Sequence, residues 1–169
     1  MQRIPRTRTA LVATAAAAVL ATAGTLTAGT AQAGDRDEER PTQRQIAALF
    51  DQWNTALRSG DPDRVAARYA RDAVLLPTAS PRIRTDRAQI TDYFAHFLQK
   101  KPHGEKIRSV ITVLDEDSAI DAGVYRFHLT DPGTGITKPV EARYSYSYEK
   151  RGNSWLIVNH HSSVLPAEG

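Results

Sequence analysis

The sequence predicts an α+β domain in which three N-terminal helices pack on one curved antiparallel sheet. Apolar residues recur at helical spacing between residues 42 and 101, and they then alternate with polar residues at strand spacing from residue 107 to residue 164. Turn-forming residues separate four such alternating segments. Helices that precede a meander of strands favour coverage of one sheet face, and the open mouth of such a curved sheet is a place where pockets form.

The first 33 residues have the pattern of a signal peptide. Three arginines precede an uncharged run from Thr9 to Ala33 that closes on Ala31-Gln32-Ala33, a small-x-small cleavage pattern. We expect general secretion with cleavage after Ala33. A membrane anchor is the alternative, because the run is long enough to span a bilayer, although its Ala, Thr and Gly content dilutes its hydrophobicity.

Cleavage would leave a chain with no net charge. Three of the 22 Lys and Arg residues lie in the predicted signal peptide and none of the 19 Asp and Glu residues do, so 19 of each remain. This balance argues against nucleic acid and, after cleavage, against a membrane surface as partners. The absence of cysteine excludes disulfides, thiol nucleophiles and thiolate metal sites. Residues 34–41 are predicted to be a flexible linker, and residues 42–169 to be one domain.

The helical part begins with cap signals. Thr42 is predicted to cap the first helix, which ends at Ser59-Gly60-Asp61-Pro62, where Asp61 and Pro62 start a second, short helix. A short buried strand is predicted at residues 73–76, and Thr85 or Asp86 caps a third helix. The predicted apolar faces of the three helices comprise Ile46, Leu49, Phe50, Trp53, Leu57, Val65, Ala66, Tyr69, Ile90, Tyr93, Phe94 and Phe97.

Four strands are predicted at residues 107–114, 119–130, 138–149 and 154–164. Successive side chains of a strand point to opposite faces, so a polar set and an aromatic set separate in the third strand. These sets are Arg143, Ser145 and Ser147 on one face and Tyr144, Tyr146 and Tyr148 on the other. The same rule puts His161 and Ser163 on the face of the last strand opposite to His160, so the two histidines cannot act on one ligand.

Several short motifs resemble a known family. They are Trp53-Asn54, Ala56-Leu57, Gly60-Asp61-Pro62, Tyr69, Leu75-Leu76-Pro77-Thr78, Tyr93-Phe94, Ala142-Arg143, His160-His161-Ser162-Ser163 and Pro166. The chain resembles the SgcJ/EcaC group of the nuclear transport factor 2-like (SnoaL-like) superfamily, which is similar in turn to the calcium/calmodulin-dependent protein kinase II association domain. The resemblance covers about residues 42–166, and it implies a cone-shaped domain that has no kinase activity of its own.

The resemblance also implies a pocket. Trp155, His161, Ser163 and Pro166 match the last strand of the association domain. Arg143 matches one of the arginines that line the pockets of such domains and take small carboxylates, whereas His128 and Ser162 stand where further arginines would be. The resemblance further implies self-association into a homodimer or a larger homo-oligomer.

The candidate ligand-binding residues are Arg143, His161, His128, Ser163, Trp53, Tyr69 and Tyr93. An arginine in a closed cavity can hold a carboxylate with two parallel hydrogen bonds. The alternative for Arg143 is a surface residue paired with Glu141 or Glu149. The alternative for His161 is a buried histidine satisfied by the backbone or by Ser163.

The function that these residues favour is a secreted domain that binds a small organic molecule, such as a carboxylate, or associates with itself. The Tyr144, Tyr146 and Tyr148 stripe is a candidate dimer face. The alternative is a small enzyme without a cofactor, of the ketosteroid-isomerase or polyketide-cyclase type, with His161 as the catalytic base and Tyr69 or Tyr93 as the oxyanion donor. No dinucleotide fingerprint and no convergent set of metal ligands is present, so we predict neither cofactor nor metal.

Overall fold

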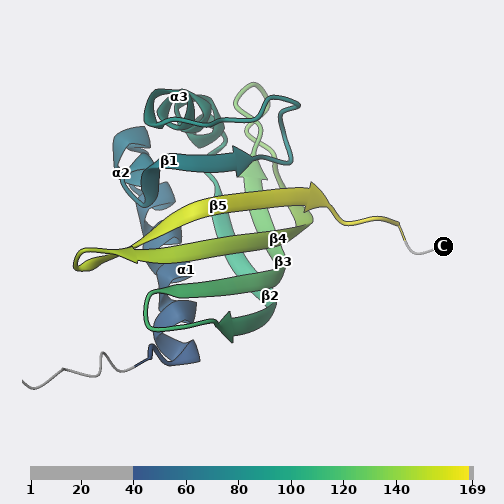
Figure 1. Cartoon of the computed structure of the whole chain (residues 1–169). Helices are drawn as coiled ribbons and strands as arrows, with labels where there is room; N and C mark the ends of the chain where they lie inside the picture. The colour runs from purple at the N-terminus through teal and green to yellow at the C-terminus, as the bar shows by residue number, and fades with distance from the viewer. Residues whose placement is uncertain (1–39, 168–169) are drawn as a thin grey trace, which may run out of the picture. The chain divides into compact units, whose positions relative to one another are not determined.

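Helices cover one face of a five-stranded sheet in the computed structural model, which describes residues 40–167 (Figure 1). The predicted signal peptide and nearly all of the predicted linker lie outside these residues. The elements in chain order are α1 (Gln43–Arg58), α2 (Pro62–Ala66), β1 (Tyr69–Leu76), α3 (Arg87–Phe97), the 3-10 helix η1 (Leu98–Lys100), β2 (His103–Val113), β3 (Ser118–Thr130), β4 (Thr137–Arg151) and β5 (Ser154–Val164).

The helices begin at the caps that the sequence predicts. The side chain of Thr42 accepts a hydrogen bond from the Gln45 N–H, and the Gln45 side chain accepts one from the Thr42 N–H, which completes a capping box for α1. Asp61 caps α2, whose first residue is Pro62. Asp86 caps α3 by accepting from the Gln89 N–H at 2.8 Å. These caps fix where each helix starts and therefore which side chains face the sheet.

The strand order is β1-β5-β4-β3-β2. Strands β2 to β5 form the predicted antiparallel meander. The strand predicted at residues 73–76 is longer, because it begins at Tyr69, and it pairs in parallel with β5, with Leu75 opposite His160. β1 is therefore an edge strand of the sheet, and β5 lies between β1 and β4.

A β-bulge interrupts β5 beside β4. Tyr148 pairs with Ile157 and the adjacent Ser147 pairs with Asn159, so Val158 is the extra residue of the pair of strands. Ile157 is buried, and so is His160 three residues later. An unbroken strand would place these two side chains on opposite faces. The bulge thus turns His160 toward the core.

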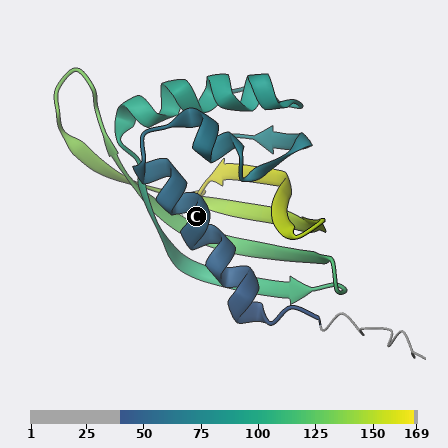
Figure 2. The ribbon, with the colours of Figure 1, turned by 90° about the vertical axis from the view of Figure 1, so that its left-hand side faces the viewer.

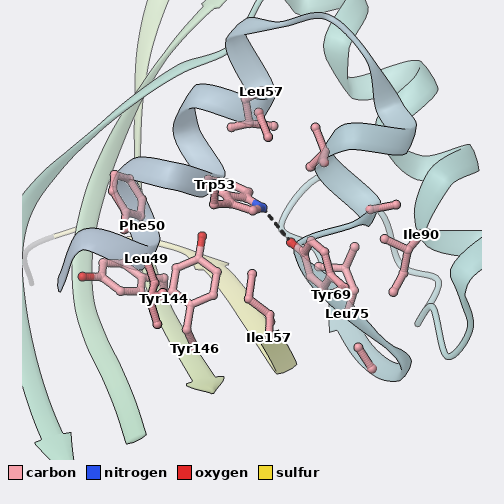
Figure 3. Packing of buried hydrophobic residues seen from close by; sticks show 14 of the residues in the cluster. Leu49, Phe50, Trp53, Leu57, Tyr69, Leu75, Ile90, Tyr144, Tyr146 and Ile157 are labelled. Atoms are coloured by element: carbon pink, nitrogen blue, oxygen red, sulfur yellow. Dashed lines mark hydrogen bonds between the residues drawn. The ribbon is translucent and has the colours of Figure 1, made fainter. Parts of the chain in front are cut away.

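The aromatic face of the sheet forms the core under α1 and α3, and Figure 2 shows α1 lying across that face. Tyr144, Tyr146 and Tyr148 are at most 4% exposed. Figure 3 shows Phe50 and Trp53 of α1 reaching toward Tyr144 and Tyr146, and the Trp53 and Tyr146 ring centroids are 5.7 Å apart. The expectation that the tyrosine stripe is a dimer face is therefore wrong, because burying these rings against α1 removes a large apolar area from water.

Candidate functional site

A cavity of about 80 Å³ lies between α3 and the inner face of strands β3, β4 and β5. Its walls are mostly apolar and aromatic. The lining residues are Trp53, Leu75, Pro77, Thr78, Ala79, Tyr93, Phe94, Phe97, Tyr125, Phe127, Leu129, Val140, Ala142, His160 and Ser162. Ala79 and Val140 are exposed, so the cavity opens to solvent beside them. An apolar hollow with a few polar groups is the usual form of a small-molecule site.

His160 is the central polar residue of the cavity wall, and a chain of hydrogen bonds holds it. The Nε1–H of Trp53 donates to the hydroxyl oxygen of Tyr69 at 3.1 Å, and the Tyr69 hydroxyl lies 2.9 Å from Nδ1 of His160. All three side chains are buried, and the ring of Tyr146 stacks on that of His160 with centroids 4.2 Å apart. The His160 ring therefore has a fixed position.

The same chain of hydrogen bonds fixes the tautomer of His160. An indole N–H can only donate, so the Tyr69 oxygen accepts from Trp53, and its own proton is satisfied only if it is donated to Nδ1 of His160. A neutral imidazole with an acceptor at Nδ1 carries its hydrogen on Nε2. Among the described residues this buried Nε2 has no hydrogen-bond partner. A buried donor without a partner is rare in folded proteins, and His160 is also one of the residues that line the cavity.

Burial keeps His160 neutral. Removal of the ring from water and, to a smaller extent, the interaction with neighbouring His161 together lower the pKa of His160 to about 3. At neutral pH His160 is therefore a hydrogen-bond donor through Nε2 and not a cation. The low pKa also makes it a weak base, since general bases work best with a pKa near the working pH.

A second polar group lies on the same wall. The Tyr125 hydroxyl donates to Oγ of Ser162, which also contacts the hydroxyl of Thr78. Burial raises the pKa of Tyr125, so its phenol stays protonated. These hydroxyls satisfy one another, and their remaining lone pairs can accept hydrogen bonds from a ligand.

None of the described residues that line this cavity carries a carboxylate. The fully buried Asp121 of β3 accepts from the Tyr144 hydroxyl at 2.9 Å and from Ser109, and it forms an ion pair with Lys106 at 3.4 Å. Its hydrogen bonds thus hold β2 and β3 together instead of serving the cavity. Within residues 40–167 no group of three His, Cys, Asp or Glu side chains is arranged to hold a metal ion. The same residues contain no helix that meets the length and hydropathy needed to cross a membrane.

The structure places only part of the predicted site at the cavity. Trp53 and Tyr93 line it, and Tyr69 lies behind the wall as the partner of His160. By contrast, Arg143, His161, Ser163 and His128 do not line it. Arg143 and His161 are exposed, and the expectation that they project into the cavity is corrected.

The physical reason is that the aromatic face of the sheet is the inner one. Arg143 pairs with Ser163 in the β4–β5 ladder, and both lie on the outer face. His128 is half-exposed there, with its Nε2 3.5 Å from Glu105. Neither predicted ion pair of Arg143 forms, because Glu141 pairs with Arg126 and Glu149 with Arg151.

The bulge in β5 is the second reason, because it brings His160 and Ser162 inward in place of His161 and Ser163. Together with Thr78 and Tyr125, these are the polar groups that sequence reasoning missed. One signal was available for them: an aromatic alternating face belongs against the helices. That signal points to the tyrosine face as the inner one.

Comparison with known families supports the fold and the resemblance. Residues 42–166 match the family model described as calcium/calmodulin dependent protein kinase II association domain. The chain belongs to this family. A solved structure described as a putative association domain of this kind, from Xanthomonas campestris, is 52% identical, with a TM-score of 0.74 over 76% of this chain and 91% of that one. A comparison with curated proteins finds no match.

More distant solved structures share the nuclear transport factor 2-like fold. A ketosteroid isomerase-like protein from Erwinia carotovora atroseptica is 18% identical, with a TM-score of 0.60 over 72% of this chain and 94% of that one. A putative dehydratase from Streptomyces avermitilis is 12% identical, with a TM-score of 0.65 over 73% of this chain and 97% of that one. At these identities the likeness concerns the fold alone.

Proposed function

We propose that this association-like domain binds a small, uncharged and largely apolar molecule whose hydrogen-bond acceptor takes the Nε2–H of His160. The single observation that carries the proposal is that buried Nε2, which lacks a partner within the described residues. A carbonyl or ether oxygen is the matching group. A cavity of about 80 Å³ holds the end of a small molecule rather than a large one, since pockets that enclose a drug-sized ligand measure roughly 300–1,000 Å³.

The lining favours an uncharged ligand over a carboxylate. Among residues 40–167 no arginine or lysine lines the cavity, and the pKa of about 3 keeps His160 neutral. A carboxylate that entered would lose its hydration without gaining a countercharge, which is costly in an apolar site. The carboxylate suggested by the position of Arg143 therefore does not belong in this cavity.

The test is a thermal-shift and NMR titration of residues 34–169 with matched small ketones, amides and carboxylic acids. Neutral compounds should bind, and replacement of His160 by Phe should weaken binding at least tenfold while keeping the stacking on Tyr146. His161→Phe is the matched control, because that exposed ring should leave binding unchanged. Equal affinity in His160→Phe and wild type, or binding by the acids alone, would contradict the proposal.

Catalysis of the ketosteroid-isomerase or dehydratase kind is the second candidate. The Nε2–H of His160 is a buried donor of the type that stabilises an oxyanion, whereas the proton of the Tyr125 hydroxyl is donated to Ser162. The described part of the chain supplies no base to the cavity, since no carboxylate of that part lines it and His161 is exposed. A turnover assay on enone substrates decides between the two: rates equal to the uncatalysed reaction support binding alone.

We further propose self-association through the outer face of the sheet, on which Arg143 and His161 lie. Within the described residues no helix covers this face (Figure 2). Val110 is 56% exposed there, and the neighbouring Ala122 and Ser145 are small, so two copies could approach closely. Light scattering should show a dimer that Ala122→Glu dissociates, with Thr134→Glu in the exposed β3–β4 turn as control. A monomeric wild type would contradict this.

Export with cleavage after Ala33 is also a proposal. It is supported by the three arginines, the uncharged run and the Ala31-Gln32-Ala33 pattern. Intact-mass measurement on protein recovered from the culture medium of a secreting host should give a chain that begins at Gly34. A full-length chain retained in the cells would contradict it.

A further inference from the structure

Arg84 is a buried charge to which the described residues offer no counter-ion. Arg84 is 7% exposed. Among residues 40–167 no carboxylate lies within ion-pair distance of its guanidinium. Burying an unpaired charge is costly, which is why buried arginines are normally paired. The backbone of Arg84 is held in place by an antiparallel bridge to Leu75 of β1. The Leu75 N–H donates to the Arg84 oxygen at 2.8 Å, and the Arg84 N–H donates to the Leu75 oxygen at 2.9 Å.

The guanidinium of Arg84 keeps free donors. It donates to the backbone oxygen of Arg82 and, at 3.2 Å, to the hydroxyl of Ser80. Its Cζ lies 5.5 Å from the centre of the Tyr93 ring, and this cation–π contact offsets part of the lost hydration. A guanidinium has five N–H groups, so donors remain beyond these two bonds.

These donors border a surface depression next to the cavity. Its polar and charged lining includes Ser80, Arg84, His96 and Lys100. It shares a wall with the cavity, formed by Tyr93 and Phe97. Asp92 also lines it, but this carboxylate is 65% exposed and lies 3.9 Å from Nδ1 of His96, away from any contact with Arg84. Positive side chains therefore outnumber negative ones around the depression.

We propose that this depression is an oxyanion site, in which Arg84 supplies a fork of N–H donors and Lys100 adds a second positive charge. Planar guanidinium groups match the oxygen spacing of carboxylates and phosphates. The site lies outside the neutral cavity that contains His160, and its ligand is the countercharge that Arg84 lacks. The two hollows share Tyr93 and Phe97 as a wall, but the acidic ligand of the depression does not enter the neutral cavity.

The experiment is an NMR titration of the side-chain Nε–H of Arg84 in residues 34–169. Sodium phosphate and sodium acetate are the two probes, and sodium chloride at the same ionic strength is the reference. Either oxyanion should shift the Arg84 signal saturably. The anion that binds with the lower Kd shows whether the site prefers a phosphate or a carboxylate. No saturable shift with either probe, relative to chloride, would overturn the proposal.

Variants give the second measurement. Arg84→Gln should abolish the thermal shift that phosphate or acetate produces, and Arg84→Lys, which keeps the charge but not the fork, should weaken it at least threefold. Arg82→Gln is the matched control, because that exposed side chain does not line the depression. An unchanged thermal shift in a folded Arg84→Gln, or an equal loss in Arg82→Gln, would overturn the site and leave the His160 cavity untouched as a separate proposal.

Discussion

His160 and His161 are consecutive in β5, yet they lie on opposite sides of the sheet and in opposite environments. His160 pairs with Tyr146 and is 4% exposed, whereas His161 pairs with Ser145 and is exposed. One ring is a neutral donor at a cavity and the other meets solvent. This pair therefore offers matched substitutions one residue apart, and the first prediction uses them.

The pH dependence of stability should carry the signature of His160. Its pKa is about 3 in the folded chain, against an ordinary value of 6.5 for a solvated histidine, so below pH 6.5 the unfolded chain binds a proton that the folded chain does not. The contribution of His160 to the free energy of unfolding is thus fully present above pH 6.5, and it is lost as the pH falls toward 3. At pH 5.5 the loss is roughly 1.4 kcal/mol.

Urea unfolding at pH 7.5 and pH 5.5 measures this loss. Other groups titrate in the same range, so the informative quantity is the difference between variants. His160→Phe should show a smaller pH dependence than wild type by about that amount, and His161→Gln should behave as wild type. A His160→Phe curve parallel to that of wild type would contradict the prediction.

Loss of the Tyr69 hydroxyl should destabilise the fold. Tyr69→Phe leaves the Trp53 Nε1–H without an acceptor and Nδ1 of His160 without a donor, both in the core. Leaving buried polar groups unpaired in this way costs on the order of 2 kcal/mol. Chemical denaturation gives the value directly.

Tyr146→Phe is the control for Tyr69→Phe. Within the described residues the Tyr146 hydroxyl is buried without a hydrogen-bond partner, so its removal should be neutral or slightly stabilising. Equal losses in the two variants would show that the hydrogen-bond chain through Tyr69 does not hold the core.

Gly123→Ala should disrupt the pairing of β2 with β3. A Cβ at this position would lie 1.9 Å from the backbone oxygen of Arg108, next to the register shift in β2, and backbone atoms cannot move aside cheaply. We expect a loss of about 3 kcal/mol or more in the free energy of unfolding. Gly133→Ala in the β3–β4 turn, where the nearest atom is 3.4 Å away, should change it little; a similar loss there would contradict the steric explanation.

Asn54→Asp should weaken the attachment of α1 to β2. The Asn54 side chain donates to the Gly104 oxygen at 2.6 Å and accepts from the Gly104 N–H at 3.0 Å. A carboxylate keeps the second bond but sets an oxygen against the Gly104 carbonyl, so we expect a loss of roughly 2 kcal/mol in urea unfolding. Asn153→Asp, in the exposed β4–β5 turn, is the control that should stay near wild type.

The sequence was sufficient for the order and type of the elements, because their local signals agree with the fold. Thr42, Asp61 and Asp86 are caps in the structure as predicted, and the change from helical to alternating spacing marks the start of the sheet. The parallel pairing of β1 with β5 was not predictable in the same way, since it joins residues about 85 positions apart through no local pattern.

The site was only partly predictable. The alternation of side chains correctly placed Arg143 and Tyr144 on opposite faces of the sheet, but it does not show which face packs against the helices. The resemblance to the association domain favoured the polar face as the lining of the pocket. In β5 alternation itself failed, because the bulge at Val158 changes the face of every residue after it. His160 therefore took the position that a regular strand would have given to His161.

The parallel contact between Leu75 of β1 and His160 of β5 also has a consequence during synthesis. The helices α1 and α2 and strand β1 leave the ribosome long before β5, the strand that pairs with β1. The hydrogen bonds from Trp53 to Tyr69 and from Tyr69 to His160 cannot all form until His160 has emerged. Contacts between such distant segments slow folding, and β1 would present an unpaired edge in the meantime. The pocket of a nascent chain thus cannot close until β5 has emerged from the ribosome.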